Sequence, residues 1–559
     1  MKKITLILLL FGLTISWSQE QEALVFFKDK KEIMASMENP ALILTNRAIE
    51  RKQKHNVLID ASDVPVDPSY ITQLKNLPDI AVLAKSKWLN TAYVRGDQTA
   101  IEALLDQQYV EAIEFMDKDL KASRPVERDK AAGKWGITLK NRSKFDYGTA
   151  TNQTEMIAAD RLHAQDYTGR GMIIAVLDSG FPGVFDNPAF QHGGSFGRFT
   201  PGGRHDKIAK IQDLLLGTYD FIDREKDVEN EIDDHGALTF SDMAGYLDGD
   251  LVGTAPDASY YLFRTEDGAT ETPAEEAYWV EALERADSLG VDVVNTSLGY
   301  RDFFDNPDYN YTYEDLDGKT TLAARGANIA FEKGLLIVVS AGNEGDGEFK
   351  KVGTPADSPN VLTVGAVDLD SKYIGFSSLG PTVDGRIKPD VVAQGSPTAV
   401  VDPEGDIAFV YGTSFSSPIT AGAVACLWQA LPDLDNGQIM QLVRESASTY
   451  ETPSDSLGYG IPNFEKALAK GRLLNLRKKQ DPHQFEVAAN PVRNDISLIF
   501  PKNSGAVRCM LYDILGTKIK AKTLKPSDNK MDVSELSRGI YIFTVKTRTG
   551  DKSFKIVKR

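Results

Sequence analysis

The sequence predicts an α/β protein in which a parallel sheet lies between helices in a three-layer arrangement. Long apolar runs recur through the middle of the chain, each ends in a small or polar residue, and stretches with helical spacing separate them. A strand that is apolar along its whole length is buried on both faces, and its alternation with helices is typical of a parallel sheet. The runs are 172–178, 291–297, 334–343 and 361–367, and the helical stretches are 274–289 and 320–334.

The 559 residues suffice for several domains, and their charge is uneven. The formal net charge is −17, and residues 501–559 hold 14 Lys and Arg against 5 Asp and Glu, so the first 500 residues carry −26. An acidic body argues against nucleic acid as a partner. Cys426 and Cys509 fall in different predicted domains, so no disulfide is expected.

Residues 1–18 are expected to form a secretory signal. Lys2 and Lys3 precede an apolar run, and small residues at 16 and 18 suit cleavage after Ser18. The run is too short to span a bilayer, and the chain offers no other candidate span. We therefore expect an exported protein.

Residues 19–120 predict a small α+β domain, because short strands and helices are mixed along them. Residues 121–151 are expected to be a linker, since they open with a charged stretch of weak periodicity. The predicted strands of the first domain are 23–27, 80–83 and 91–95, and its predicted helices are 46–53 and 99–105.

The α/β domain is expected to extend over residues 152–473, and residues 474–483 are expected to be a basic linker. The character of the chain then changes. Residues 484–559 alternate short strands with turn signals, which predicts a C-terminal β-sandwich. Its predicted strands are 496–500, 507–512, 518–520, 540–545 and 554–557.

A serine at the start of a closely packed helix is the first candidate for chemistry. An apolar run at 407–411 leads through Gly412 and Thr413 to Ser414, and a stretch rich in Ala and Gly follows. Pro418 is expected in the first turn of this helix, where its missing N–H costs nothing. A helix N-terminus favours a developing oxyanion. Taken alone, however, a buried helix with a capping serine is the simpler interpretation.

A serine nucleophile also needs a base, a carboxylate that orients the base, and an oxyanion donor. Among the six histidines, His235 follows a polar stretch and begins a predicted helix. Asp178 ends an apolar strand, where its carboxylate needs either an imidazole partner or the turn at 179–180. Asn343 lies beside glycine and is either a side-chain donor or a turn residue. Asp178 and Asn343 both fall at carboxyl ends of predicted strands, where parallel sheets place their sites.

Together these residues match, in the order Asp, His, Asn, Ser, the motifs of the subtilisin-like serine proteases, or subtilases. Residues 154–466 resemble this family. The resemblance implies a subtilisin-like fold with Asp178 as orienter, His235 as general base and acid, Ser414 as nucleophile and Asn343 as oxyanion donor. The motifs are Ala-Val-Leu-Asp178-Ser-Gly, His235-Gly-Ala, Asn295-Thr-Ser-Leu-Gly299, Ser-Ala-Gly-Asn343-Glu-Gly and Gly-Thr-Ser414-Phe-Ser-Ser-Pro418.

The resemblance also implies where substrate binds. Ser297, Leu298 and Gly299 are expected to line the cleft as an edge strand, with which an extended peptide pairs. Gly342 and Glu344 are expected near the pocket for the side chain that precedes the scissile bond. No cofactor is required for this chemistry.

Some features depart from the family pattern or compete with it. Ala237 replaces the usual Thr after His-Gly, which is expected to loosen the cap of that helix. Residues 301–317 are an acidic, Tyr-rich insertion that either shapes specificity or only covers the surface. Structural calcium stays open at an unknown site, because Asp315-Leu-Asp-Gly318 hints at calcium but lacks the later ligands. A Gly-x-Ser-x-Gly pattern at 193–197 fits esterases, but it has no strand before it and no helix after it.

The flanking domains resemble two known types. Arg47-Ala-Ile-Glu-Arg51 and Ser86-Lys-Trp-Leu-Asn90 resemble the propeptides of secreted Bacteroidetes subtilases, which implies an intramolecular inhibitor and folding template removed by self-cleavage within 121–151. The C-terminal domain resembles the sorting domains of the type IX secretion system, through Leu511-Tyr-Asp-Ile-Leu-Gly516 and Leu536-Ser-Arg-Gly539-Ile-Tyr. This implies the secretion machinery as a partner, and export through the periplasm to the medium or the outer cell surface.

We therefore predict a secreted serine endopeptidase, made as a self-processing zymogen, that hydrolyses peptide bonds in proteins through an acyl-enzyme on Ser414. The alternative is a catalytically silent surface adhesin or binding module on the same scaffold. The sequence leaves the substrate, the cleavage preference and the oligomeric state open.

Overall fold

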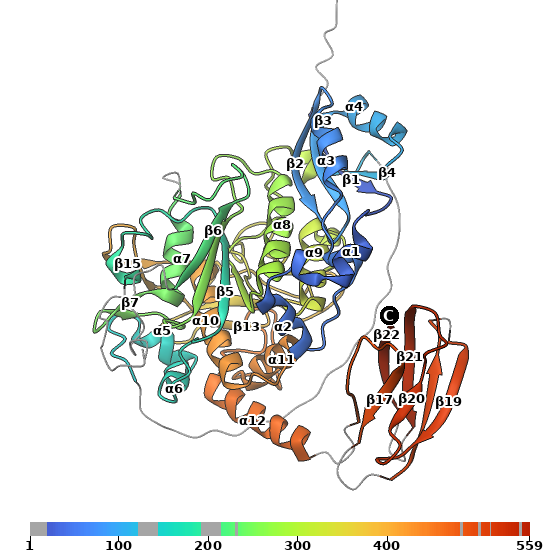
Figure 1. The fold of residues 1–559 in the computed structure, drawn as a ribbon. Helices are drawn as coiled ribbons and strands as arrows, with labels where there is room; N and C mark the ends of the chain where they lie inside the picture. Colours follow the sequence, from blue (N-terminus) through green and yellow to red (C-terminus); the bar gives the residue numbers. More distant parts are fainter. Residues whose placement is uncertain are drawn as a thin grey trace, which may run out of the picture. The chain divides into compact units, whose positions relative to one another are not determined.

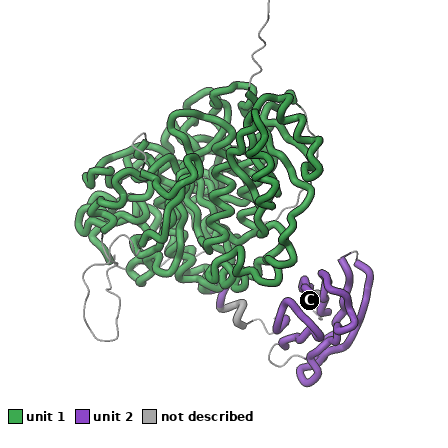
Figure 2. Tube along the Cα trace, turned by 45° about the horizontal axis from the view of Figure 1, so that its top comes forward, with its two compact units in different colours: residues 1–472 green, residues 473–559 purple. Residues whose placement is uncertain are grey.

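A computed structural model of the chain describes residues 20–120, 144–191, 214–229, 233–480, 485–500, 505–514, 516–546 and 551–559. The chain divides into two compact units, residues 1–472 and 473–559, which Figure 2 colours separately. In the part that is described, none of the helices combines the length and apolar character that crossing a bilayer requires. Outside the described residues lie the expected signal, most of the expected 121–151 linker, the pattern at 193–197, His192, His205 and His483.

The first unit begins with an antiparallel sheet of strand order β2-β3-β1-β4, whose two faces pack against different helices. Along β1, Ala23 and Val25 face a core shared with α3 and α4, while Leu24 faces a cluster shared with α8 (Ala274–Leu289) and α9 (Leu322–Glu332). This is the period of two of a strand between two layers. The elements are β1 (Glu20–Phe27), α3 (Pro68–Lys75), β2 (Ile80–Ser86), β3 (Thr91–Asp97), α4 (Gln98–Glu102), η3 (Ala103–Asp106) and β4 (Val110–Phe115).

Residues 28–67 connect β1 to α3 and are called the N-terminal arm. Its main helix is α2 (Asn46–Lys54), where Thr45 is the N-cap and accepts a hydrogen bond from the N–H of Ala48. Basic side chains fill the last turn of α2, which suits the negative end of the helix dipole. The arm also contains α1 (Ile33–Glu38), η1 (Pro40–Leu42) and η2 (Ala61–Asp63).

The larger part of the first unit is built on a seven-stranded sheet of order β13-β12-β11-β10-β5-β9-β6, in which every pair of neighbours is parallel. The predicted apolar runs form β5, β10, β11 and β12, and the fold class is confirmed. The strands are β5 (Ile173–Asp178), β6 (Leu215–Asp220), β9 (Ser259–Arg264), β10 (Val293–Thr296), β11 (Leu336–Ser340), β12 (Leu362–Asp368) and β13 (Val391–Ser396).

Helices cover both faces of this sheet (Figure 1). α8 and α9 share a buried cluster with Ala175, Leu177 and Val294, whereas α10 (Thr413–Ala430) packs on β10 to β13 and α7 (His235–Ala244) on β5. α12 continues through most of the expected 474–483 linker. The remaining elements are α5 (Thr151–Met156), α6 (Asp160–His163), η4 (Pro188–Phe190), β7 (Tyr246–Leu247), β8 (Leu251–Val252), η6 (Pro307–Tyr309), η7 (Tyr313–Asp315), β14 (Thr398–Val401), β15 (Ile407–Val410), α11 (Asn436–Ser446) and α12 (Phe464–Gln480).

The second unit contains two antiparallel sheets around one core, as the sequence predicts. The strand orders are β16-β17-β20 and β19-β18-β21-β22. Ile496 of β17 and Phe543 of β21 lie in the same buried cluster, so the sheets pack face to face. The strands are β16 (Glu486–Val487), β17 (Asp495–Ile499), β18 (Val507–Tyr512), β19 (Lys518–Leu524), β20 (Lys530–Asp532), β21 (Gly539–Lys546) and β22 (Asp551–Lys558).

The expectation that Pro418 occupies the first turn of its helix is wrong. α10 starts at Thr413, which places Pro418 in the helix interior. A proline there cannot donate to the carbonyl four residues earlier, which belongs to Ser414. That carbonyl accepts a hydrogen bond of 2.7 Å from the hydroxyl of Ser297 instead. The proline thus frees a backbone oxygen that ties α10 to the segment after β10.

Candidate active site

Asp178 and His235 form a hydrogen-bonded pair at the carboxyl edge of the parallel sheet. Asp178 is the last residue of β5, and His235 is the first residue of α7. Nδ1 of His235 lies 2.7 Å from Oδ1 of Asp178, whose side chain is almost fully buried. A charge-assisted hydrogen bond of this length belongs to the strong class.

Further donors hold the Asp178 carboxylate. Ser179 donates to Oδ1 through its backbone N–H over 2.9 Å and through its hydroxyl over 3.3 Å. Thr239 donates to Oδ2 over 3.1 Å. Asp178 therefore has both of the partners that the sequence offered as alternatives. It pairs with an imidazole, and it closes the turn that follows β5. Sequence reasoning missed Thr239, although its position four residues after His235 puts both on one face of α7.

The start of α7 is held in a different way from the family pattern. The side chain of the N-cap residue Asp234 makes no capping hydrogen bond, and the N–H of His235 donates to the side chain of Asp233 over 3.0 Å. Gly236 permits a close approach, since a Cβ there would lie 2.2 Å from the carbonyl oxygen of Gly180. Asp233 thus supplies a contact at the helix start that Ala237 cannot make.

Ser414 is the second residue of α10 and is 8 % exposed. Its hydroxyl donates to the carbonyl oxygen of Ser297 over 3.3 Å, and the ring of the next residue, Phe415, lies 5.7 Å from the imidazole of His235. Ser297 and Ser414 therefore contact each other twice, since the hydroxyl of Ser297 binds the Ser414 carbonyl. Ser414 lies at a helix N-terminus, and the residue after it contacts the imidazole of the Asp178–His235 pair.

The amide of Asn343 is fixed in orientation by Thr413. Oδ1 of Asn343 accepts from the backbone N–H of Thr413 over 2.9 Å and from its hydroxyl over 3.0 Å. The same hydroxyl accepts from the N–H of Gly342, which adopts a φ of +100° that glycine tolerates best. With Oδ1 engaged, the NH₂ group of Asn343 remains to donate elsewhere.

A pocket of about 200 Å³ opens beside Ser414. All five residues expected to bind substrate line it together with Asn343 and Ser414. These five are Ser297, Leu298, Gly299, Gly342 and Glu344. Residues 297–299 belong to no strand, because β10 ends at Thr296. Their expected pairing with an extended peptide stays a prediction.

Arg301 also lines this pocket and was not expected there. Its guanidinium forms an ion pair of 2.6 Å with Glu344 and lies 4.6 Å from the centre of the Phe303 ring. No sequence pattern links Arg301 to Glu344, which come from the insertion and from the loop after β11. The first residues of the insertion thus help to form the pocket, while Tyr309 and Tyr311 are buried in the core.

The motif considered for calcium and another of the six histidines are both bonded within the protein. Asp315 binds the ammonium of Lys118 over 2.6 Å and the N–H of Thr312 over 2.7 Å, and Asp317 accepts from backbone N–H groups at 319 and 320. These carboxylates bind protein donors, and structural calcium at an unknown site stays a prediction. His163 is buried and bonded to Tyr147 and to the carbonyl of Thr254, which makes it structural.

Comparison with known proteins decides the family. The model of the subtilase family matches residues 169–460, more than half of the chain, and this segment contains Asp178, His235, Asn343 and Ser414. The protein belongs to the subtilase family. Subtilisin NAT of Bacillus subtilis subsp. natto is 28 % identical over 371 residues, which are 66 % of this chain and 80 % of that protein. Serine protease AprX of Bacillus subtilis is 26 % identical over 362 residues, 59 % of this chain and 74 % of that protein.

The flanking domains of this subtilase match families of their own. Residues 22–132 match the Bacteroidota peptidase S8 propeptide domain, and residues 487–559 match the secretion system C-terminal sorting domain. The protein is therefore a secreted serine protease with a propeptide and a sorting domain. Among solved structures, MycP1 from Mycobacterium smegmatis is similar with a TM-score of 0.44 and 22 % identity, covering 61 % of this chain and 89 % of that one.

We predict that the imidazole of His235 titrates above pH 6.5. Burial alone would lower the pKa of His235, but the Asp178 charge and hydrogen bond outweigh it and raise the pKa from 6.5 to about 9. The side chain is 30 % exposed, so solvent screens part of this attraction and the pKa should fall between these two values. NMR titration of histidine-labelled protein measures it, and His235→Gln assigns the signal. Asp178→Asn should lower the pKa, and an unchanged value would contradict the pairing.

Proposed function

We propose that this subtilase hydrolyses peptide bonds in proteins through an acyl-enzyme formed on Ser414. One observation carries the proposal. The Asp178–His235 pair, with its 2.7 Å hydrogen bond, lies at the sheet edge where α10 presents Ser414. A strong carboxylate–imidazole pair beside a serine at a helix N-terminus is the arrangement that activates a hydroxyl.

In the first step, the Ser414 hydroxyl turns from the Ser297 carbonyl to Nε2 of His235 and attacks the scissile carbonyl carbon. An O–C bond forms, the carbonyl electron pair moves to oxygen, and Nε2 takes the proton. Asp178 holds the Nδ1–H and stabilises the imidazolium. The tetrahedral intermediate then collapses, the C–N bond breaks, and His235 gives the proton to the leaving amine. Water repeats these steps on the ester and releases the acid.

Asn343 is proposed to donate its NH₂ group to the oxyanion, together with the backbone N–H of Ser414. Thr413 supports this role, because its two hydrogen bonds to Oδ1 keep the amide from rotating. A donor that is already oriented needs no reorganisation when charge develops on the substrate oxygen. The N-terminus of α10 adds its dipole to the same position.

The pocket beside Ser414 is proposed to bind the side chain that precedes the scissile bond. Small residues make up much of its wall, so it has room for a large apolar side chain. Arg301 neutralises the carboxylate of Glu344, which would otherwise attract a basic side chain. The small lining residues are Gly299, Ala341, Gly342, Gly353 and Ala356.

The propeptide is proposed to be removed by self-cleavage within residues 121–151. The test uses a fluorophosphonate probe, which forms a covalent bond only with an activated serine. Protein freed of its propeptide should be labelled, and Ser414→Ala should be neither labelled nor processed. A processed wild-type protein that resists the probe would favour a silent adhesin on this scaffold. Processing of Ser414→Ala at the normal rate would assign the cleavage to another protease.

Asn343→Ala should lower kcat by about 10²–10³ with little change in KM, which is the loss typical of removing the oxyanion-hole asparagine of subtilisin. The loss falls on kcat because the donor meets the oxyanion only in the transition state. Thr413→Val removes the hydroxyl bond to Oδ1 of Asn343 and keeps the backbone one, so it should give a smaller loss of the same kind. Steady-state kinetics on a peptide amide measure both. A rise in KM with kcat unchanged for Asn343→Ala would instead indicate a role in substrate binding.

Arg301→Ala should raise kcat/KM for substrates with Lys or Arg before the scissile bond, relative to Phe or Leu, by about fivefold. The reason is that Glu344 loses its partner, and a partly exposed ion pair is worth up to about 1 kcal/mol. Profiling with a mixed peptide library measures the ratio. The matched control is Arg301→Ala with Glu344→Gln, in which the ratio should return to that of the parent. A ratio unchanged in Arg301→Ala would show that the pair does not set this preference.

A further inference from the structure

The N-terminal arm reaches the ends of the two helices that support the propeptide sheet. Its helix α2 begins where α8 ends, and the N–H of its N-cap Thr45 donates to the carbonyl of Ser288 over 2.9 Å. The carbonyls at a helix C-terminus lack partners within their own helix. The positive end of the α2 dipole therefore meets the negative end of the α8 dipole.

Two glycines of the catalytic domain make this approach close. Gly290 ends α8 at a φ of +86°, and a Cβ there would lie 2.8 Å from the N atom of Ala48. Gly334 follows α9 at a φ of +90°, and a Cβ there would lie 3.1 Å from Cγ2 of Val57. Each glycine leaves its helix in the left-handed conformation and presents no side chain to the arm. The shape of this surface is therefore complementary to the backbone of the arm.

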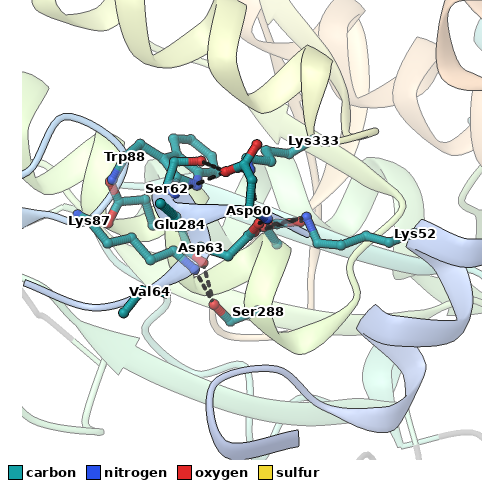
Figure 3. A network of polar contacts seen from close by, with 12 residues as sticks. Lys52, Asp60, Ser62, Asp63, Val64, Lys87, Trp88, Glu284, Ser288 and Lys333 are labelled. Atoms are coloured by element: carbon teal, nitrogen blue, oxygen red, sulfur yellow. Dashed lines mark hydrogen bonds and ion pairs between the residues drawn. The ribbon is translucent and has the colours of Figure 1, made fainter. Parts of the chain in front are cut away.

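Buried ion pairs cross the contact in both directions. On one side, Asp287 of α8 pairs with Lys52 over 2.8 Å and with Arg51 over 2.6 Å. On the other side, Lys333 after α9 pairs with Asp63 over 2.9 Å. Each domain thus supplies both an anion and a cation to the other. Figure 3 shows Lys52, Asp63 and Lys333 in this network.

These charges are removed from water almost completely. The side chains of Lys52, Asp63 and Asp287 are 0 % exposed, and those of Arg51 and Lys333 are 4 % and 7 % exposed. A buried charge that loses its partner is strongly unfavourable, even where the pair as a whole adds little stability. The surface therefore accepts a partner whose charges match and rejects one without them.

The contact lies at the amino ends of the parallel strands, whereas the active site lies at their carboxyl ends. Arg47 of α2 pairs with Asp292, and Oδ2 of Asp292 accepts from the N–H of Ile173, the first residue of β5. The catalytic candidate Asp178 is the last residue of the same strand. Binding of the arm therefore does not require that the cleft be occupied.

We propose that the C-terminal ends of α8 and α9 form an exosite, defined by Asp287, Gly290, Asp292, Lys333 and Gly334, whose partner is the N-terminal arm of the propeptide. The exosite binds a basic helix, α2, and the acidic turn that follows it. It keeps the propeptide on the catalytic domain after the connecting chain is cut. A propeptide that has the sheet but lacks the arm would be held far more weakly.

The test measures how fast a cut propeptide leaves. The full chain carries Ser414→Ala and the recognition sequence of a site-specific protease within residues 121–143, and it is immobilised through a tag after Arg559. After cutting with the added protease, release of the propeptide is followed over time. The parent should retain it, and Lys52→Met or Asp287→Asn should release it at least about 100-fold faster.

A matched control crosses the same domain boundary at its rim. Arg325 and Glu114 form an ion pair of 3.0 Å with side chains that are 26 % and 35 % exposed. Glu114→Gln should change the release rate by less than about fivefold, because exposed pairs contribute little. The effects of Lys52→Met and Asp287→Asn on the release rate should also be coupled. The double variant should release the propeptide far more slowly than the product of the two single fold-changes predicts.

The experiment tests the exosite independently of catalytic activity and of the folding of any one variant. Ser414→Ala removes the proposed nucleophile, so the result holds whether or not the protein is a self-processing protease. If Lys52→Met fails to fold before cutting, Lys333→Met tests the reciprocal pair from the catalytic side. Release of the parent propeptide during cutting, or equal rates for the parent, Lys52→Met, Asp287→Asn and Lys333→Met, would overturn the exosite.

Discussion

The site depends on the cost of placing a carboxylate at the end of a buried strand. Every residue of β5 is buried, and Asp178 is only 2 % exposed. An ionised carboxylate there is stable only with several hydrogen bonds or an opposite charge. The fold supplies donors from the turn after β5 and from α7, and one of them is the imidazole of His235. The position of α7 follows from this need, and the raised pKa of His235 follows from the same contact.

The proline in α10 creates a similar need for a hydrogen-bond partner at Ser414. Without an N–H at Pro418, the carbonyl of Ser414 has no partner within the helix, and the Ser297 hydroxyl takes that place. In return, the hydroxyl of Ser414 contacts the carbonyl of Ser297. The segment that lines the pocket and the residue proposed to attack the substrate are thereby held as one unit. A regular helix without the proline would satisfy its own carbonyl, and the contact from the Ser297 hydroxyl would be lost.

The sequence predicts the parts of the site that lie at the ends of regular elements. Asp178, Asn343 and Ser414 could be found because each follows an apolar run, and the polar residue after such a run is conspicuous. Thr239 and the Arg301–Glu344 pair could not, because their contacts depend on how separate segments approach in space. Pro418 was misplaced by one turn, since local propensity favours proline at a helix start and the contact with Ser297 overrides it. The family motifs supplied the roles, which spacing alone does not.

The carboxyl and amino ends of the strands in the parallel sheet have different functions, and they are called its carboxyl edge and its amino edge. The carboxyl edge brings together Asp178, His235 and Ser414, and small displacements there are costly for catalysis. The amino edge holds Asp292 and the ends of α8 and α9, where the N-terminal arm binds. The contacts of the arm involve Asp287, Asp292 and Lys333, which are separate from the catalytic candidates at the carboxyl edge. Affinity for the propeptide can therefore vary through the arm without altering the catalytic residues, whereas affinity built into the cleft would also change the binding of substrates.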